Sequence, residues 1–336
     1  MRDARPLARL LADPARAGEV RDWTSLIALA RAESLAGSLA WRLERQVVPP
    51  RVETLLEAAR RDSEAARVQA LWEAEMARRA LAPLGVPVIL LKGTAFAAAG
   101  LEAARGRSIG DLDILVPRPA LPNVERALLA AGWEWVKEDP YDDQYYRRWM
   151  HELPPLIHRE RDRMIDVHHA ILPLTARPKP DMAAMIEASV ALGDGLRVLA
   201  PQDMVIHAAA HLFADGDLAG GLRNLWDIDR LIREFNEHEG FWNALLANSR
   251  KHGLSVPVGR AIRLSSRLFG TPSAPTRDWS ARPDDIVYLR RLLARDGWGR
   301  KTRPLTRLGF YVRSHWLRMP PLMLARHLWV KARRKS

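Results

Sequence analysis

GDLDILV, residues 110–116, places two aspartates at the start of an apolar run. A short run of branched apolar residues predicts a buried β-strand. Because successive side chains on a strand point to opposite faces, Asp111 and Asp113 share one face, roughly 6.6 Å apart along the chain. Two neighbouring carboxylates repel each other unless one is protonated or a cation lies between them. The stretch therefore predicts a strand that binds a hard divalent cation such as Mg²⁺, which prefers oxygen ligands.

A second motif, LKGT at 91–94, precedes this strand where an apolar strand is expected to run into a helix. The free N–H groups at a helix start favour phosphate, Gly93 permits close approach, and Thr94 can cap the helix or contact a phosphate oxygen. Taken alone, the motif is better explained as an ordinary strand-to-helix turn. Lys92 within the motif and Arg107 after it supply an ammonium and a planar guanidinium that can bind phosphate oxygens.

A third motif, IDVH at 165–168, alternates apolar and polar residues as a half-buried strand does. The alternation puts Asp166 and His168 on one face of that strand. Asp166 is therefore a third candidate carboxylate for the cation. His168 either contacts phosphate or metal directly, or orients the aspartate as an outer partner.

In this order the three motifs resemble a bacterial family of uncharacterised nucleotidyltransferases within the DNA polymerase β-like nucleotidyltransferase superfamily. The matching segments are 91–93, 107–116 and 165–168, and the resemblance extends over residues 85 to 235. The chain departs from the wider superfamily in two ways. Lys92-Gly93-Thr94 replaces the usual Gly-Ser pair, and sixteen residues separate Thr94 from Asp111. Both departures bear on how a triphosphate is held.

The resemblance implies a transferase that moves a nucleoside monophosphate from a nucleoside triphosphate such as ATP to an acceptor hydroxyl and releases pyrophosphate. Asp111 and Asp113 would hold two Mg²⁺ or Mn²⁺ ions, and Asp166 would complete the second ion's shell and accept the hydroxyl proton. The residues that would bind the nucleotide and its phosphates are Lys92, Gly93, Thr94, Arg107, Ser108 and His168. The acceptor stays open between a small molecule, a peptide and RNA.

Two other function classes fit a D-x-D strand. Many glycosyltransferases also bind a metal and a diphosphate through D-x-D, but they usually place it after a longer α/β domain than the one strand and helix found here. A non-catalytic nucleotide-binding protein is the second alternative. The retention of Asp111, Asp113 and Asp166 argues against it.

The wider pattern predicts an α+β fold with a small mixed sheet. We expect a helical N-terminal region over 1–82, a nucleotidyltransferase-like core over 83–200, a helical domain over 201–299 and a basic amphipathic segment over 300–336. Six strands are expected, at 86–91, 111–116, 133–136, 154–159, 164–172 and 196–200, of which the fourth and fifth form a hairpin. The polar stretch 137–152 is expected to be an irregular loop.

The net charge of +12 is concentrated at the C-terminus. Eleven of the 52 Lys and Arg residues, and no acidic residue, lie in 300–336, which leaves 41 basic against 40 acidic residues elsewhere. The same segment carries many aromatic and aliphatic residues, as interfacial helices on anionic lipid do. Packing of its apolar side on the domain is the favoured interpretation, and binding to the inner face of the membrane is the second. Nucleic-acid binding is the third, because no recognisable nucleic-acid-binding motif accompanies the charge. The chain has no cysteine and no visible signal pattern, so we expect a cytoplasmic protein.

Other groups are expected to be structural. His207 and His211 have the i, i+4 spacing of a zinc pair on a helix, but packing is favoured because the glutamate of H-E-x-x-H is absent. Asp227 and Asp229 spell a second D-x-D on a helix, where they point ~200° apart, so Asp227 is expected to pair with Arg223 instead. His151 is a weak site candidate. The aromatic residues of the polar stretch either stack on a base or pack together; they are Tyr141, Tyr145, Tyr146 and Trp149.

Overall fold

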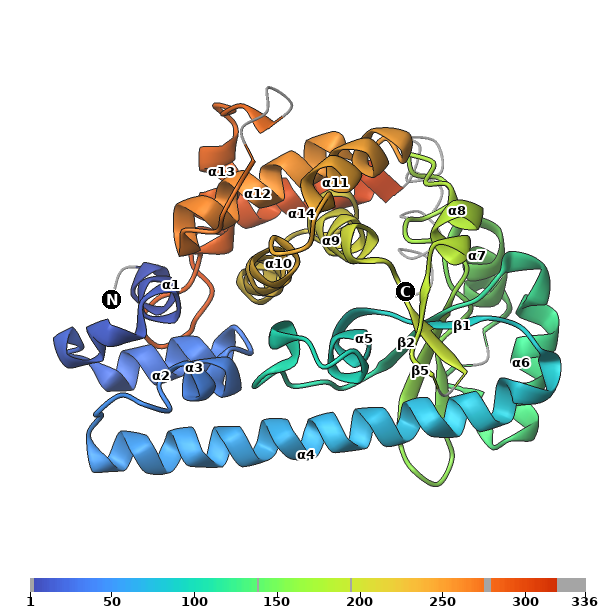
Figure 1. Ribbon diagram of the computed structural model, residues 1–336, viewed down its shortest axis with the longest axis horizontal. Coiled ribbons are helices and arrows are strands. Elements are labelled where there is room, and N and C mark those ends of the chain that lie inside the picture. The colour runs from blue at the N-terminus through green and yellow to red at the C-terminus, as the bar shows by residue number, and fades with distance from the viewer. Residues whose placement is uncertain (1–2, 138, 194, 275–278, 319–336) are drawn as a thin grey trace, which may run out of the picture.

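The computed structural model describes residues 3–137, 139–193, 195–274 and 279–318 of the 336-residue chain. It confirms the predicted α+β fold, a mixed sheet surrounded by many helices (Figure 1). The last part of the predicted basic segment, 319–336, lies outside the described residues. Among the helices that are described, none combines the length and the apolar character needed to cross a membrane.

Seven strands form one sheet in the order β3-β4-β5-β2-β1-β7-β6. In chain order the strands are β1 Val88–Leu90, β2 Leu112–Leu115, β3 Trp133–Trp135, β4 Leu156–His158, β5 Met164–His168, β6 Val190–Ala191 and β7 Leu196–Val198. β2 pairs with β5 in parallel and with β1 antiparallel, so the two aspartate-bearing strands lie next to each other at the centre of the sheet. The hairpin β4–β5 is confirmed. The short edge strand β6 was not predicted.

The central strands divide apolar from polar side chains between the two faces of the sheet. Leu112 and Ile114 of β2 pair in register with Ile165 and Val167 of β5, and all four are buried. The intervening residues, which include the aspartates and His168, belong to the other face. The helix α4, Pro50–Leu81, contacts β1 and β2 and packs on α5, Lys92–Ala98, and on α6, Leu121–Ala130. Figure 1 shows α4 running along one side of the whole molecule, from the N-terminal helices to the sheet.

The remaining helices lie before α4 or after the sheet in the chain, and α12 of the later set packs on α1 of the earlier one. Before α4 come α1 Arg5–Ala12, α2 Trp23–Ala32 and α3 Ala36–Arg42, and Ser34, where φ is +54°, lies between α2 and α3. After the sheet come α8 Met182–Glu187, α9 Pro201–Ala210, α10 Gly221–Phe235, α11 Phe241–Lys251, α12 Ser255–Phe269, α13 Asp285–Leu292 and α14 Pro304–Arg318. A π-helix, His211–Asp215, extends α9.

The prediction of an irregular loop over 137–152 was wrong, because α7 spans Pro140–Trp149. Proline is well suited to the first turn of a helix, and a mostly polar helix is stable when its side chains pair at i, i+4. Arg147 Nε donates to Asp143 Oδ1 at 2.8 Å, and the same guanidinium pairs with Glu125 of α6. The rings of Tyr145 and Trp149 are 5.8 Å apart, so the described part of the aromatic cluster packs on itself.

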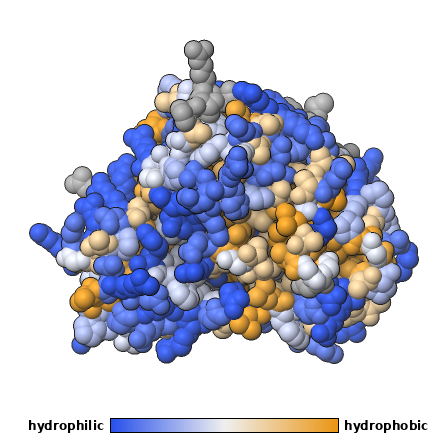
Figure 2. Space-filling view, in the orientation of Figure 1, coloured by the Kyte–Doolittle hydropathy of each residue, from blue (hydrophilic) through white to orange (hydrophobic). Residues whose placement is uncertain are grey.

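Hydrophilic residues predominate on the left of the face seen in Figure 2, over the N-terminal helices. Hydrophobic residues gather toward its centre and right, over the sheet and the helices beside it. The helix α14 also carries exposed apolar side chains: Leu305 is 82% exposed, and Leu308, Val312 and Trp316 are each more than half exposed.

Candidate active site

Asp113 and Asp166 are direct register partners on the parallel strands β2 and β5. Asp111 occupies a bend immediately before β2 and is exposed, whereas Asp113 is buried. One carboxylate oxygen from each of the three residues lies within 4.8 Å of the others. The spacing in GDLDILV thus has the predicted consequence that Asp111 and Asp113 share a face. We call Asp111, Asp113 and Asp166 the aspartate cluster.

Lys92 supplies a positive charge to the aspartate cluster. Its Nζ donates to Asp113 Oδ1 at 2.6 Å, and its backbone has φ +49° at the first residue of α5. Burial alone would lower the pKa of Lys92, but the Asp113 charge and hydrogen bond outweigh burial and raise it. Burial alone would raise the pKa of Asp113, yet Lys92 and His168 together hold it well below its usual range. Asp113 is therefore a carboxylate and Lys92 an ammonium.

His168 and Glu152 extend this polar network. His168 Nε2 lies 2.9 Å from Asp113 Oδ1, and its Nδ1 lies 3.3 Å from Glu152 Oε2. Glu152 lies on a segment that runs antiparallel to the end of β5. The backbone of Glu152 forms an isolated β-bridge with His168, and Leu153 N donates to Val167 O at 2.9 Å. Glu152 was not among the predicted site residues, because the sequence gave no reason to separate it from a polar loop.

The site carries more negative than positive charge. Burial, followed by the charges of Asp113 and Glu152, raises the pKa of Asp166 to about 7, although His168 and Lys92 act in the opposite direction. Burial is the largest cause of this raised pKa, and the negative charges of Asp113 and Glu152 add to it. A cluster of carboxylate oxygens with unbalanced negative charge is the donor set that hard divalent cations such as Mg²⁺ take. The aspartate cluster therefore fits the metal that the sequence predicts.

Gly93 and Thr94 lie in the first turn of α5, where both are buried. A β-carbon at Gly93 would lie 2.5 Å from Arg107 Nε, so the glycine admits the Arg107 side chain. Arg107 Nη1 is 3.2 Å from Asp227 Oδ2, and its buried Nε has no hydrogen-bond partner among the described residues. The Thr94 hydroxyl likewise has no partner among them. Thr94 is not the helix cap, because α5 begins two residues earlier and Leu91 precedes it.

The structure does not bring Ser108 to the aspartate cluster. Ser108 is exposed and lines a hollow of about 300 Å³ with Gly37, Asp62 and other residues of α3 and α4. The second D-x-D is also separate from the site. Asp227 pairs with Arg223 at 2.6 Å as predicted, whereas Asp229 pairs with Arg233 at 3.0 Å.

Three further histidines lie near the cluster. His207 on α9 is buried, and burial followed by the charge of Lys92 takes its pKa well below the ordinary value. The pKa of His151 is also well below the ordinary value, through burial and then the charges of His168 and His211. His207 is buried on α9, and neither His207 nor His211 belongs to a group of potential metal ligands among the described residues. His151 joins Glu152 and His168 in a second group of potential metal ligands.

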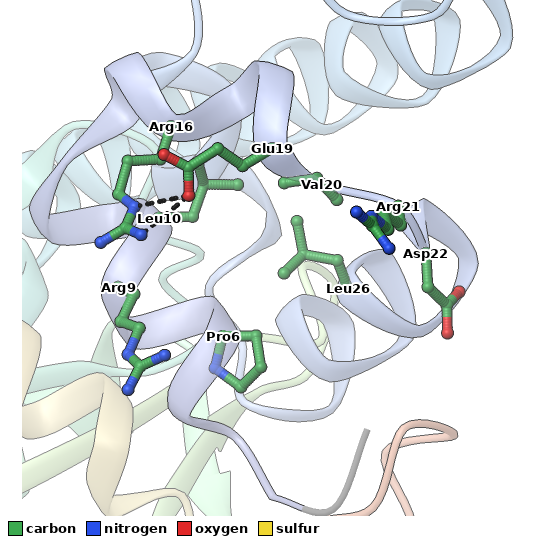
Figure 3. Close-up of a pocket in the computed structure, with 9 residues that line it drawn as sticks. All are labelled: Pro6, Arg9, Leu10, Arg16, Glu19, Val20, Arg21, Asp22 and Leu26. Atoms are coloured by element: carbon green, nitrogen blue, oxygen red, sulfur yellow. Dashed lines mark hydrogen bonds and ion pairs between the residues drawn. The ribbon is translucent and has the colours of Figure 1, made fainter.

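A larger hollow, of about 320 Å³, lies far from the aspartate cluster among the N-terminal helices (Figure 3). Pro6, Arg9 and Leu26 face it from α1 and α2, and Arg16 beside it is held by an ion pair with Glu19 at 2.7 Å. It contains no group of carboxylates comparable with the aspartate cluster. We therefore place the candidate active site at the sheet, where the charged residues converge.

Comparison with known proteins identifies the family of the chain. Residues 19–270 match the model of a family described as uncharacterised nucleotidyltransferase. Because the match covers most of the chain, the protein belongs to that family. The family name supports transfer of a nucleotidyl group and leaves the substrates open. A search of curated proteins gave no match.

Proposed function

We propose that the protein is a metal-dependent nucleotidyltransferase that moves a nucleoside monophosphate from a nucleoside triphosphate to an acceptor hydroxyl. The observation that carries this proposal is the register pairing of Asp113 with Asp166, with Asp111 beside them. It agrees with the family assignment. No comparable observation favours a glycosyltransferase or a protein that only binds nucleotides.

In the proposed reaction the acceptor oxygen attacks the α-phosphorus, the bond from the α-phosphorus to the bridging oxygen breaks, and pyrophosphate leaves. Two divalent ions would neutralise triphosphate charge and lower the pKa of the acceptor hydroxyl. Asp111 and Asp113 would hold both ions, and Asp166 would complete the shell of the second and accept the hydroxyl proton. Because Asp113 and Asp166 sit on paired strands, their carboxylates are positioned before substrate binds.

Lys92 has two successive partners in this proposal. Its ammonium neutralises Asp113 when no other cation is present, at an Nζ–Oδ1 distance of 2.6 Å. If a metal were bound at Asp113, the flexible Lys92 side chain would be available to bind a triphosphate oxygen. Arg107 lies over Gly93 with its Nε unpartnered and is the second cation proposed to contact phosphate. His168 keeps the Asp113 carboxylate oriented through its Nε2.

We also propose that the C-terminal segment holds the protein on anionic membrane lipid. Leu305, Leu308, Val312 and Trp316 are exposed along one stripe of α14, since they are spaced by three or four residues. The sequence from 300 to 336 adds eleven cations and no acidic residue, which complements a negatively charged surface. Buried Phe310 and Ser314 on α14 contact the body of the protein, so the helix is attached by one side and presents the other.

The function is tested by following label from a nucleoside triphosphate in a cell extract that supplies acceptors. The purified protein should transfer label from the α-phosphate and none from the γ-phosphate, and the transfer should require Mg²⁺ or Mn²⁺. Asp113→Asn should fold but lose transfer, whereas Asp162→Asn, in the exposed turn before β5, should keep it. Transfer of γ-label, or equal α-label transfer by Asp113→Asn, would contradict the proposal.

A further inference from the structure

A second group of metal ligands lies next to the aspartate cluster and is different in chemistry. His151, Glu152 and His168 each present a ligand atom within 4.8 Å of the others. His168 Nδ1 is 3.3 Å and His151 Nε2 is 3.7 Å from the same oxygen, Glu152 Oε2. We call these three residues the histidine–glutamate cluster. Two imidazoles and one carboxylate suit zinc-class ions, whereas Mg²⁺ takes oxygen ligands.

The separations agree with a tetrahedral ion. Zinc bonds to His nitrogen and carboxylate oxygen are ~2.0–2.2 Å long, so two ligands of a tetrahedral ion lie ~3.3–3.6 Å apart. The two separations to Glu152 Oε2 are close to this range without any ion present. The His151 and His168 rings are 5.3 Å apart between centroids and inclined by 32°, so they face the glutamate from neighbouring positions.

The His168 nitrogen that faces this cluster has no hydrogen-bond partner among the described residues. This nitrogen is Nδ1, and His168 is 2% exposed. Its other nitrogen, Nε2, is 2.9 Å from Asp113 Oδ1. A metal-binding histidine almost always donates its second N–H to a carboxylate, carbonyl or water, which fixes the ring and raises its basicity. Asp113 is therefore the carboxylate that would accept the second N–H of a metal-bound His168.

The backbone holds the cluster in place. His169 N donates to His151 O at 2.8 Å, and Glu152 bridges His168 across the end of β5. Two of the ligands are thus on one short segment and the third on the strand it pairs with. Directly beyond α9, the π-helix His211–Asp215 begins, and the His211 charge acts on the His151 ring. Such π-helical turns often occur at functional sites.

We propose that His151, Glu152 and His168 bind one zinc-class divalent ion, distinct from the ions at the aspartate cluster. Three protein ligands with a fourth position open are the pattern of zinc sites that bind water or substrate. The ion would be linked to the aspartate cluster through His168, whose two nitrogens serve the two sites. This proposal does not depend on nucleotide transfer, because its test uses zinc and no nucleotide.

The test measures zinc retained per chain by mass spectrometry after incubation with Zn²⁺ in excess Mg²⁺ and gel filtration. We expect one zinc per chain for the wild type, and at least tenfold weaker zinc binding for His151→Gln and for Glu152→Gln. Glu152 is partly exposed, so its variant is the one expected to fold in any case. His169→Gln is the matched control, since His169 is equally buried and adjacent on the same strand end but belongs to neither cluster.

Asp111→Asn separates the two sites, because it removes an aspartate-cluster ligand and leaves the histidine–glutamate cluster complete. This variant should retain zinc as the wild type does. The wild type loaded with Co²⁺ in place of zinc should show the visible absorption of a tetrahedral site. The proposal is overturned if the folded wild type retains no zinc, if Glu152→Gln binds it as well as the wild type, or if Asp111→Asn loses it.

Discussion

The ammonium of Lys92 lies 2.6 Å from Asp113 Oδ1, and the negative charges of Asp111 and Glu152 also act on it. In metal-free protein this contact supplies the cation that Asp113 needs in order to stay ionised while buried. The same contact explains why a lysine follows β1 at this point. Lys92 and a divalent ion would therefore compete for Asp113.

Lys92→Met should destabilise the metal-free protein by about 1–3 kcal/mol, because Asp113 loses a partner in a buried position. Methionine keeps the unbranched stem, so the strain at φ +49° is unchanged. Mg²⁺ should restore more stability in the variant than in the wild type. Thermal melts with chelator and with Mg²⁺ measure both effects. Lys251→Met, which removes an exposed partner of Asp181, is the control and should shift the melt little. Equal Mg²⁺ responses would disprove the competition.

Asp166 should make the metal-free protein less stable as pH rises. Its pKa is raised by burial to about 7 in the folded protein, above the ordinary value of 3.8. Folding therefore favours the protonated carboxyl, so this contribution to stability is present below pH 3.8 and is lost as pH rises through about 7. Asp166→Asn should remove the loss between pH 5 and pH 8. Denaturant titrations in chelator across this pH range, with Asp162→Asn as control, should show a flatter profile for Asp166→Asn alone.

Gly93→Ala should destabilise the protein, because the added methyl group would displace the Arg107 side chain. The added carbon would lie 2.5 Å from Arg107 Nε and 3.1 Å from Ile109 Cγ1. We expect a loss of about 1–3 kcal/mol in the free energy of unfolding. The loss should be smaller in an Arg107→Ala background, which a double-mutant cycle measures. Gly309→Ala, at an open position of α14, is the control and should be neutral or stabilising. Equal losses in both backgrounds would refute the packing role.

The proposed membrane contact depends on the exposed stripe of α14. Leu308→Asp combined with Val312→Asp should greatly reduce sedimentation with vesicles of phosphatidylcholine and phosphatidylserine, because it places charge where apolar contact is needed. Wild-type binding should weaken with salt and be absent with pure phosphatidylcholine. Val287→Asp on α13 is a control of similar exposure. If the double variant sediments as the wild type does, α14 is not the contact.

Period-two patterns made the central strands predictable. The alternation in GDLDILV and IDVH was enough to place Asp111 with Asp113, and Asp166 with His168, on one face of their own strands. The pairing of β2 with β5 across fifty residues was not visible in either motif. This pairing depends on how the apolar faces of the two strands pack together in the folded protein, and a local sequence pattern cannot predict that packing.

Contacts made by side chains across the fold could not be predicted from local sequence. Lys92 was expected to bind phosphate, but its direct contact with Asp113 depends on how β1 lies beside β2. Arg107 reaches Asp227 on α10, 120 residues away. Glu152 lies at the end of a polar stretch in which nothing distinguishes it from the other charged residues. The helix in that stretch, α7, is stabilised by ion pairs such as Arg147 with Asp143. Each of these contacts requires the tertiary arrangement first.

Calorimetric titration of the protein with a nucleoside triphosphate, with and without Mg²⁺, tests the central claim most directly because it needs no acceptor. We expect binding that requires Mg²⁺, that is retained by Asp162→Asn, and that is at least tenfold weaker for folded Asp111→Asn, which lacks one metal ligand of the aspartate cluster. Absence of Mg²⁺-dependent binding for all four ribonucleoside triphosphates, or equal affinity in Asp111→Asn, would contradict the assignment of the aspartate cluster as the catalytic site.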